Sequence, residues 1–282
     1  MAWHPDVKSL NAGGHRFALM EQGEGEAVVL IHGITTYSFI WRKILPHLPD
    51  DKRIIAYDLL GCGGSDMPLD VDYSLTMHAE RLFLMLKQLK VERVHLVGHD
   101  VGGGVAQIFA VRYPEMVIDL CLVNTVAYNY WPVQPIKIMQ TPILRNFAMA
   151  TLDIGSFPLV VRRGLYRKDR LDSELLNLFR APIQTSIGRK AFMRFARCLD
   201  SRNLTDISED LPKLAIPVLV IRGEADVYLS EEISLRLKRE IPGCLLLRIA
   251  TAGHYIQEDE PVQLAIALNS FWAGETVDRA FA

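Results

Sequence analysis

Hydrophobic residues fall into short, largely continuous runs along the chain, at residues 27–31, 54–58, 93–97, 117–123, 218–221 and 245–249. Each run has the length of one strand, and strands that are apolar on both sides are typical of a parallel sheet covered on both faces. Residues 7–21 are more polar and contain Gly13-Gly14 near their centre. This pattern predicts a hairpin at the antiparallel edge of the same sheet.

Segments with helical periodicity separate these strands. One helix begins after Ser74, an N-cap residue, and its apolar positions recur at i, i+3, i+4 and i+7. A second helix follows residue 100 and ends before Pro114, and the last spans about residues 261–272. Alternating strands and helices predict an α/β fold with a mostly parallel sheet and helices on both faces.

The alternation breaks between the strands at 117–123 and 218–221. The intervening sequence is helical, aromatic and basic, with helices expected at residues 171–179 and 187–198. We predict a core of residues 1–127 and 214–282 and a helical cap of residues 128–213 above the site. The basic residues between 162 and 170 are interpreted as a solvated helix face.

One acidic residue occupies the junction between a predicted strand and helix, in the motif Gly98-His99-Asp100-Val101-Gly102-Gly103. Small residues on both sides of Asp100 allow the sharp turn of a nucleophile elbow. The elbow usually carries serine, and an aspartate cannot form an ordinary acyl-enzyme on an ester. The motif therefore argues against an esterase or a lyase on this scaffold.

Two further polar residues follow strands nearer the end of the chain. Asp226 comes after the strand at 218–221, and His254 comes after the strand at 245–249. Sites form at the carboxyl edge of parallel sheets, and nucleophile, acid, histidine is the chain order expected after an elbow. Asp226 alone could be a helix cap and His254 an ordinary loop histidine, but together with Asp100 they predict a catalytic set.

These motifs resemble the α/β-hydrolase fold family, and within it the aspartate-nucleophile branch that holds haloalkane dehalogenases and epoxide hydrolases. The resemblance covers nearly the whole chain. It rests on the elbow, on His32-Gly33 with Phe39-Ile40-Trp41-Arg42, and on Gly253-His254 with the residues 257–261.

The resemblance implies a two-step mechanism. An ionised Asp100 attacks saturated carbon, and water deprotonated by His254 then hydrolyses the alkyl-enzyme ester. Asp226 holds the imidazole of His254 in the required tautomer. The backbone N–H groups of Ile34 and Val101 form the oxyanion hole, so their side chains need not be polar.

Two positions separate the subfamilies. The dehalogenases have a tryptophan where this chain has Val101 and usually an asparagine where it has Ile34, so a departing halide loses both standard donors. Epoxide hydrolases protonate the leaving oxygen from cap tyrosines, and Tyr128, Tyr130 and Tyr166 are candidates for contacting substrate. Simple packing is the alternative for each tyrosine. In addition, Thr35 stands where epoxide hydrolases have a proline, so neither subfamily matches fully.

We therefore expect an epoxide hydrolase-like enzyme that acts on a small, largely apolar substrate. A haloalkane dehalogenase-like enzyme and a small-molecule receptor with little turnover are the alternatives. Product formation, as opposed to mere thermal stabilisation by the same ligands, separates an enzyme from a receptor.

Composition limits the remaining function classes. The 282 residues, half of them apolar, suit one domain with an insertion. Lys and Arg number 31 against 33 Asp and Glu, without a long block of one sign, which argues against nucleic-acid and membrane partners.

The four cysteines lack metal-site or disulfide spacing and are expected to be reduced thiols. No cofactor motif, leader or apolar run of about 18 residues stands out, so we expect a cytoplasmic enzyme without metal or cofactor. The sequence leaves the oligomeric state open.

Overall fold

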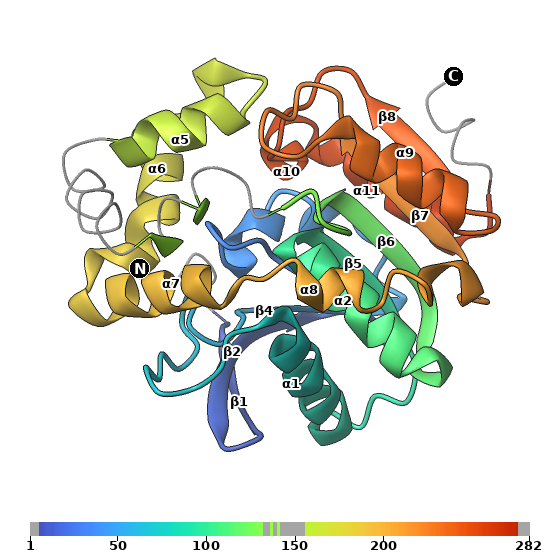
Figure 1. Cartoon of the computed structure of the whole chain (residues 1–282), viewed down its shortest axis with the longest axis horizontal. Coiled ribbons are helices and arrows are strands. Elements are labelled where there is room, and N and C mark those ends of the chain that lie inside the picture. The colour runs from blue at the N-terminus through green and yellow to red at the C-terminus, as the bar shows by residue number, and fades with distance from the viewer. Residues whose placement is uncertain (1–5, 132–135, 138–139, 142–155, 276–282) are drawn as a thin grey trace.

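A single mixed sheet organises the molecule. The computed structural model describes residues 6–131, 136–137, 140–141 and 156–275 of the chain. Eight strands form the sheet in the order β1-β2-β4-β3-β5-β6-β7-β8 (Figure 1). β1 (Lys8–Ala12) and β2 (His15–Gln22) form an antiparallel hairpin, and β2 also pairs antiparallel with β4. The α/β fold and the edge hairpin expected from the hydrophobic pattern are confirmed.

The remaining strands pair in parallel and match the apolar runs. They are β3 (Glu26–Ile31), β4 (Lys52–Tyr57), β5 (Val94–Asp100), β6 (Val117–Thr125), β7 (Val218–Gly223) and β8 (Leu245–Ile249). Every residue of β5 is buried, because this central strand has a neighbour on each side and helices above and below. Asp100, at its end, is therefore placed in the middle of the carboxyl edge of the sheet.

Helices cover both faces of the sheet. They are α1 (Leu75–Gln88), α2 (Val101–Arg112), α9 (Glu231–Glu240), α10 (Ile256–Asp259) and α11 (Pro261–Trp272). The Ser74 hydroxyl accepts a hydrogen bond from the Met77 N–H, which confirms the predicted N-cap of α1. Figure 1 views the face that α1, α2 and α9 cover. The sequence analysis did not identify α9, because it is mostly charged and buries few apolar side chains.

Between β6 and β7, the described residues include the helices α5 (Ser156–Gly164), α6 (Ser173–Arg180), α7 (Ser186–Cys198) and α8 (Arg202–Thr205). α6 and α7 agree with the two helices expected in this region. Figure 1 shows α5, α6 and α7 together beyond one end of the sheet. Residues 132–135, 138–139 and 142–155 of the predicted cap lie outside the described residues, so the division into core and cap stays a prediction.

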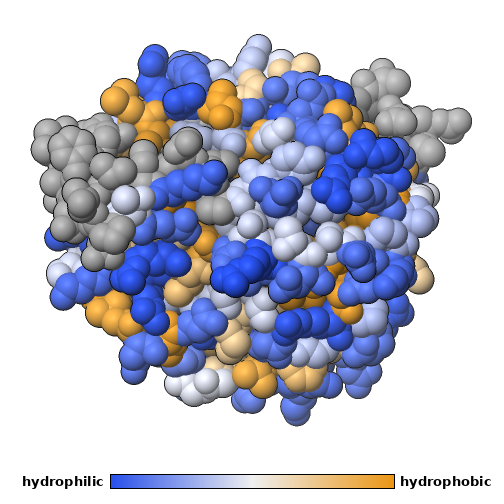
Figure 2. Space-filling model, in the orientation of Figure 1, coloured by the Kyte–Doolittle hydropathy of each residue, from blue (hydrophilic) through white to orange (hydrophobic). Residues whose placement is uncertain are grey.

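The surface seen in Figure 2 is mostly hydrophilic and the cysteines are unpaired, as the composition and the cysteine spacing predict. Hydrophilic side chains cover most of the face seen in Figure 2, with hydrophobic residues scattered between them. Among the described helices, none has both the length and the apolar character needed to cross a bilayer. All four cysteines are free, as their spacing predicts.

Candidate active site

A strained turn carries Asp100 from β5 into α2. The backbone of Asp100 has φ 53° and ψ −121°, a conformation that is unfavourable for a residue with a side chain. Gly98 allows the helix to approach the strand, since a Cβ there would lie 2.5 Å from the Gly102 carbonyl oxygen and from the Gly103 Cα. This sharp strand-to-helix turn has the geometry of a nucleophile elbow and presents the Asp100 carboxylate at the sheet edge.

Two backbone N–H groups bind the Asp100 carboxylate. The Ile34 N–H donates to Oδ2 at 3.1 Å, and the Val101 N–H also donates to the carboxylate. The loop after β3 comes very close here, because a Cβ on Gly33 would lie 2.8 Å from both Cβ and Oδ2 of Asp100. These donors belong to the main chain, so the aliphatic side chains of Ile34 and Val101 do not weaken them.

Asp226 and His254 are hydrogen-bonded to each other. The distance from His254 Nδ1 to Asp226 Oδ2 is 3.0 Å, and both side chains are buried. Asp226 Oδ1 accepts hydrogen bonds from the backbone N–H groups of Tyr228 at 2.8 Å and Leu229 at 3.2 Å. Because Nδ1 donates to the carboxylate, the neutral imidazole has its free lone pair on Nε2, the nitrogen that can accept a proton.

The charges of the three residues are coupled. Burial raises the pKa of Asp100, and the opposing effects of His254 and the two N–H groups do not cancel this rise. Burial by itself would lower the pKa of His254, but the charge and hydrogen bond of Asp226, with the charge of Asp100, give a net rise. Burial also acts to raise the pKa of Asp226, yet His254 and the two amides hold it below its ordinary value. Asp226 is therefore the most firmly ionised group of the three.

Asp100 and His254 open into one cavity. Its empty space is about 530 Å³, mouth included, and apolar side chains form most of its lining, among them Val126, Trp131 and Val160. A cavity lined mostly by apolar side chains suits a small, largely apolar molecule. Among the described residues, no group of three His, Cys, Asp or Glu side chains converges as a metal site.

Asn124 braces the two loops that carry Asp226 and His254, and the sequence analysis missed it. It lies near the end of β6 with φ 37°. Its Nδ2 donates to the carbonyl oxygens of Gly253 and His254 at 2.8 and 3.0 Å, and its Oδ1 accepts from the Gly223 N–H at 3.0 Å. A polar residue at the carboxyl end of an apolar strand was the available signal.

Asp259 connects the histidine loop to the segment that follows α5. Its buried carboxylate accepts hydrogen bonds from the N–H groups of Gly253 at 2.8 Å, Tyr166 at 2.9 Å and Arg167 at 2.9 Å. The histidine loop is thereby tied to residues 166–167. Asp259 stands within the motif at residues 257–261, but its sequence position alone did not predict these three hydrogen bonds.

His32 and His99 flank the site, and both bond to the backbone. The Nδ1–H of His32 donates to the Gly33 carbonyl at 2.7 Å, and its Nε2 accepts from the Leu59 N–H at 2.9 Å. His99 Nε2 bonds to the His254 carbonyl at 3.0 Å. Burial lowers the pKa of His32 to about 4 and that of His99 to about 3, so both are neutral.

The structure does not bring the three predicted tyrosines into the cavity. Tyr128 is buried beneath Arg236 of α9, whose guanidinium lies 3.8 Å from the ring centroid. Tyr130 and Tyr166 are 37% and 47% exposed. The tyrosines that line the cavity are Tyr228 and Tyr255 instead. Their sequence signal was proximity: Tyr228 follows Asp226 by two residues, and Tyr255 directly follows His254.

Comparisons with known proteins agree with this architecture. Residues 26–261 match the model of the alpha/beta hydrolase fold. A cis-3-alkyl-4-alkyloxetan-2-one decarboxylase of Shewanella oneidensis is 29% identical, covering 93% of this chain and 86% of that protein. A haloalkane dehalogenase of Mesorhizobium japonicum is 28% identical over 90% of this chain and 86% of its own length. The structure of the epoxide hydrolase CorEH superposes with a TM-score of 0.82 over 95% of this chain and 98% of its own; at 19% identity it supports the fold alone.

Proposed function

The chain belongs to the alpha/beta hydrolase fold family, and we propose that it is an enzyme that hydrolyses an epoxide through a covalent alkyl-enzyme ester on Asp100. One observation carries the proposal. A carboxylate stands at the apex of a nucleophile elbow, held by two backbone N–H groups, in the same apolar cavity as a histidine paired with an acid.

In the first step, an oxygen of the Asp100 carboxylate forms a bond to a ring carbon of the epoxide. The bond between that carbon and the ring oxygen breaks, and the oxygen takes up a proton. Asp100 needs no base for this attack, because its ionised form is already a nucleophile. The apolar cavity strengthens the attack by removing water from the carboxylate.

In the second step, His254 takes a proton from water, and the resulting hydroxide attacks the ester carbonyl carbon. The tetrahedral oxyanion receives hydrogen bonds from the N–H groups of Ile34 and Val101, and loss of one such donor typically costs about 3 kcal/mol. The intermediate collapses to the free acid, and the departing alkoxide takes the proton from His254.

Esterification of Asp100 itself prepares His254 for the second step. The charge of Asp100 contributes to the raised pKa of His254. An alkyl ester carries no charge, so this contribution disappears once the first step is complete. The pKa of His254 then falls, and a larger fraction of the imidazole is neutral and able to accept a proton.

An epoxide fits the site better than a haloalkane. Its leaving oxygen stays attached to the product, so it needs no separate anion site. The side chains at the two positions that hold the halide in dehalogenases are Ile34 and Val101 here, and neither can donate a hydrogen bond. Haloalkane hydrolysis remains the alternative that the relative from Mesorhizobium japonicum supports.

A β-lactone is a second candidate substrate, because the relative from Shewanella oneidensis is a decarboxylase of such rings. Its leaving carboxylate also stays attached when a nucleophile attacks the saturated ring carbon. Decarboxylation would release carbon dioxide and an alkene without consuming water. Epoxide hydrolysis consumes water and yields a diol, so the products separate the two reactions.

The decisive experiment is to trap the ester in a His254→Gln variant, in which attack remains possible and hydrolysis does not. The charge of His254 lowers the pKa of Asp100, so its removal raises that pKa further, and the trapping is run at about pH 9. Intact-protein mass spectrometry should show a gain of the whole epoxide mass, on the peptide that contains Asp100. A haloalkane would add its mass minus hydrogen halide.

The control is the double variant Asp100→Asn, His254→Gln, which should gain no mass. An epoxide that the wild type hydrolyses but that leaves no adduct on His254→Gln would overturn the covalent mechanism. Ligands that raise the melting temperature of the wild type without any product would favour the receptor alternative.

A further inference from the structure

Opening an epoxide leaves a strongly basic oxygen that must receive a proton. The three tyrosines expected to supply it lie elsewhere, and the two that line the cavity come from the core loops, Tyr228 after β7 and Tyr255 after β8. Only a hydroxyl whose proton is not already bonded within the protein can donate into the cavity.

The proton of Tyr228 is already engaged. Its hydroxyl donates to the Val160 carbonyl of α5 at 2.5 Å. A carbonyl oxygen can only accept, so this bond takes up the one proton that Tyr228 carries. Donation to a substrate would require the bond to break.

The hydroxyl of Tyr255 has a different kind of hydrogen-bond partner. Its hydroxyl lies 3.1 Å from Thr35 Oγ1, and either hydroxyl can donate to the other. The pair carries two protons, and their mutual hydrogen bond uses one. Among the described residues, neither hydroxyl has a further hydrogen-bond partner, so one proton is available to a third group.

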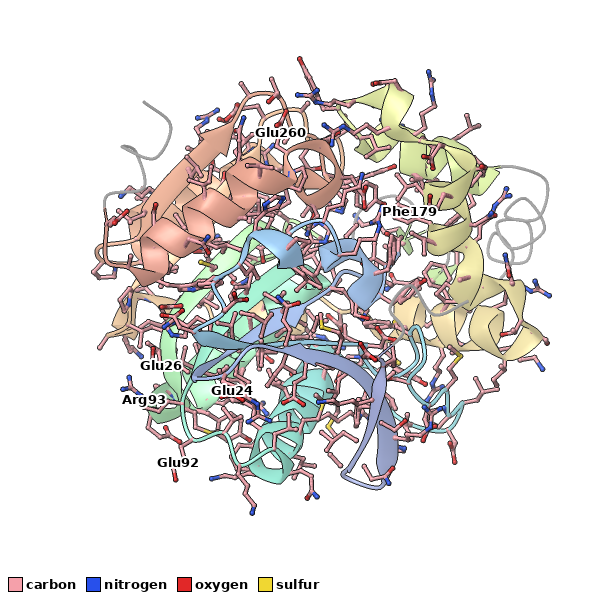
Figure 3. The ribbon with its side chains drawn as sticks, turned by 180° about the vertical axis from the view of Figure 1, so that it is seen from behind. Glu24, Glu26, Glu92, Arg93, Phe179 and Glu260 are labelled. Atoms are coloured by element: carbon pink, nitrogen blue, oxygen red, sulfur yellow. The ribbon has the colours of Figure 1, made fainter. Side chains whose placement is uncertain are left out.

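Both hydroxyl-bearing residues line the cavity together with Asp100 and His254. Thr35 directly follows Ile34, whose N–H binds the Asp100 carboxylate. The ring of Tyr255 is held edge-on between His254 and Phe179, each with its centroid 5.0 Å away. Phe179 lies on α6 and is seen near the junction of that helix with the core in Figure 3. Tyr255 is therefore held in a fixed orientation at the wall of the cavity.

We propose that Tyr255 is the acid that protonates the leaving oxygen, and that Thr35 donates a hydrogen bond to the phenol oxygen as it loses its proton. This assignment rests on the proposed epoxide hydrolysis. Burial raises the pKa of Tyr255 well above its ordinary value, so the phenol keeps its proton at neutral and mildly alkaline pH, where Asp100 attacks in its ionised form. An alkoxide is a stronger base than a phenolate, and the hydrogen bond from Thr35 lowers the pKa of Tyr255 and so offsets part of the effect of burial on this transfer.

The protons balance over one turnover. The phenol proton goes to the ring oxygen during the first step. In the second step, His254 passes one proton of the attacking water to the departing alkoxide. The other proton is released when Asp100 ionises again, and it restores the phenol of Tyr255.

The test measures the first step alone, in the His254→Gln background, by the rate at which an epoxide adds its mass to the protein. Tyr255→Phe should slow this alkylation about 100-fold, the usual contribution of a positioned acid. Thr35→Val should slow it by a smaller factor, about tenfold, and Thr35→Ser, which keeps the hydroxyl, should restore most of the rate. Tyr228→Phe should slow it less than Tyr255→Phe does, because the Tyr228 proton is held by Val160.

A solvent isotope effect distinguishes proton donation from simple packing. Alkylation should be slower in D₂O when Tyr255 is present, and the difference should disappear in Tyr255→Phe. Unchanged alkylation rates in Tyr255→Phe and Thr35→Val would overturn the assignment while leaving the covalent mechanism intact. If the parent His254→Gln gains no mass from any epoxide that the wild type hydrolyses, the proposed function fails first, and this assignment fails with it.

Discussion

Replacing Asp226 by Asn should block the second chemical step and spare the first. In the structure, Asp226 Oδ1 accepts two backbone N–H groups, and Oδ2 accepts the Nδ1–H of His254. An asparagine that keeps the two backbone bonds must direct its NH₂ group at the imidazole. That group can only donate, so the proton of the neutral imidazole moves to Nε2. Nε2 can then no longer accept a proton from water.

The size of the effect follows from this change of tautomer. An amide in place of the orienting carboxylate lowers turnover by about 10⁴-fold in a triad of this kind, which corresponds to roughly 5 kcal/mol of activation free energy. Loss of the Asp226 charge also lowers the pKa of His254, which weakens it as a base. The attack by Asp100 uses neither group as a base, so the alkylation rate should change by less than about tenfold.

The assay combines rapid quenching with intact-protein mass spectrometry. Asp226→Asn should form the ester at a rate near that of the wild type and then retain it, while steady-state turnover falls. The matched control is Glu224→Gln, an acid-to-amide change on the same loop at a carboxylate that faces Arg248. It should leave turnover within about twofold of the wild type, because surface ion pairs contribute little.

Two results would refute the reasoning. Turnover of Asp226→Asn at a rate near that of the wild type would show that Asp226 does not set the tautomer of His254. An equal loss of rate in both steps, with no ester detected and an unchanged melting temperature, would show that Asp226 acts before the attack on the substrate.

Three further predictions concern the nucleophile, its titration and the buried ion pairs of Glu258. Asp100→Asn should abolish turnover without lowering the melting temperature, since the amide has nearly the same shape but is a poor nucleophile; full activity would remove Asp100 from the mechanism. Because burial raises the pKa of Asp100 and only its ionised form attacks, the single-turnover alkylation rate should fall with decreasing pH through a midpoint above about 4, and a midpoint at or below 4 would contradict this. Glu258 is fully buried and pairs with Arg42 and Lys43, so Glu258→Gln should lower the free energy of unfolding by about 2 kcal/mol, measured by urea denaturation. An unchanged urea midpoint would show that these ion pairs do not stabilise the fold.

Local sequence patterns predicted the strands and helices more completely than they predicted the side chains of the site. The parallel strands, the hairpin, the N-cap at Ser74 and the helices α6 and α7 were all expected from local patterns. The helix α9 was missed, because only one side of it is buried and most of its residues are charged. The end of β6 was placed at residue 123, which left Asn124 outside the predicted strand.

Local sequence determined the elbow and the positions of Asp226 and His254, because each follows directly from a strand that ends at a known edge of the sheet. The sequence by itself placed these residues at the same edge of the sheet, but it did not give the distances between their side chains. Local sequence did not determine which tyrosines line the cavity. Tyr128, Tyr130 and Tyr166 are as aromatic as Tyr228 and Tyr255, and no local pattern separates the two groups.

Only the tertiary structure decided which hydroxyls reach the cavity. Tyr255 and Thr35 are 220 positions apart in the chain, and they meet because β3 and β8 deliver their loops to one sheet edge. The same holds for Asn124, whose amide spans the loops of Asp226 and His254. Strand and helix periodicity records which face of an element is buried. It does not record which side chains from distant elements fill the same space, and those contacts arise only when the whole chain has folded.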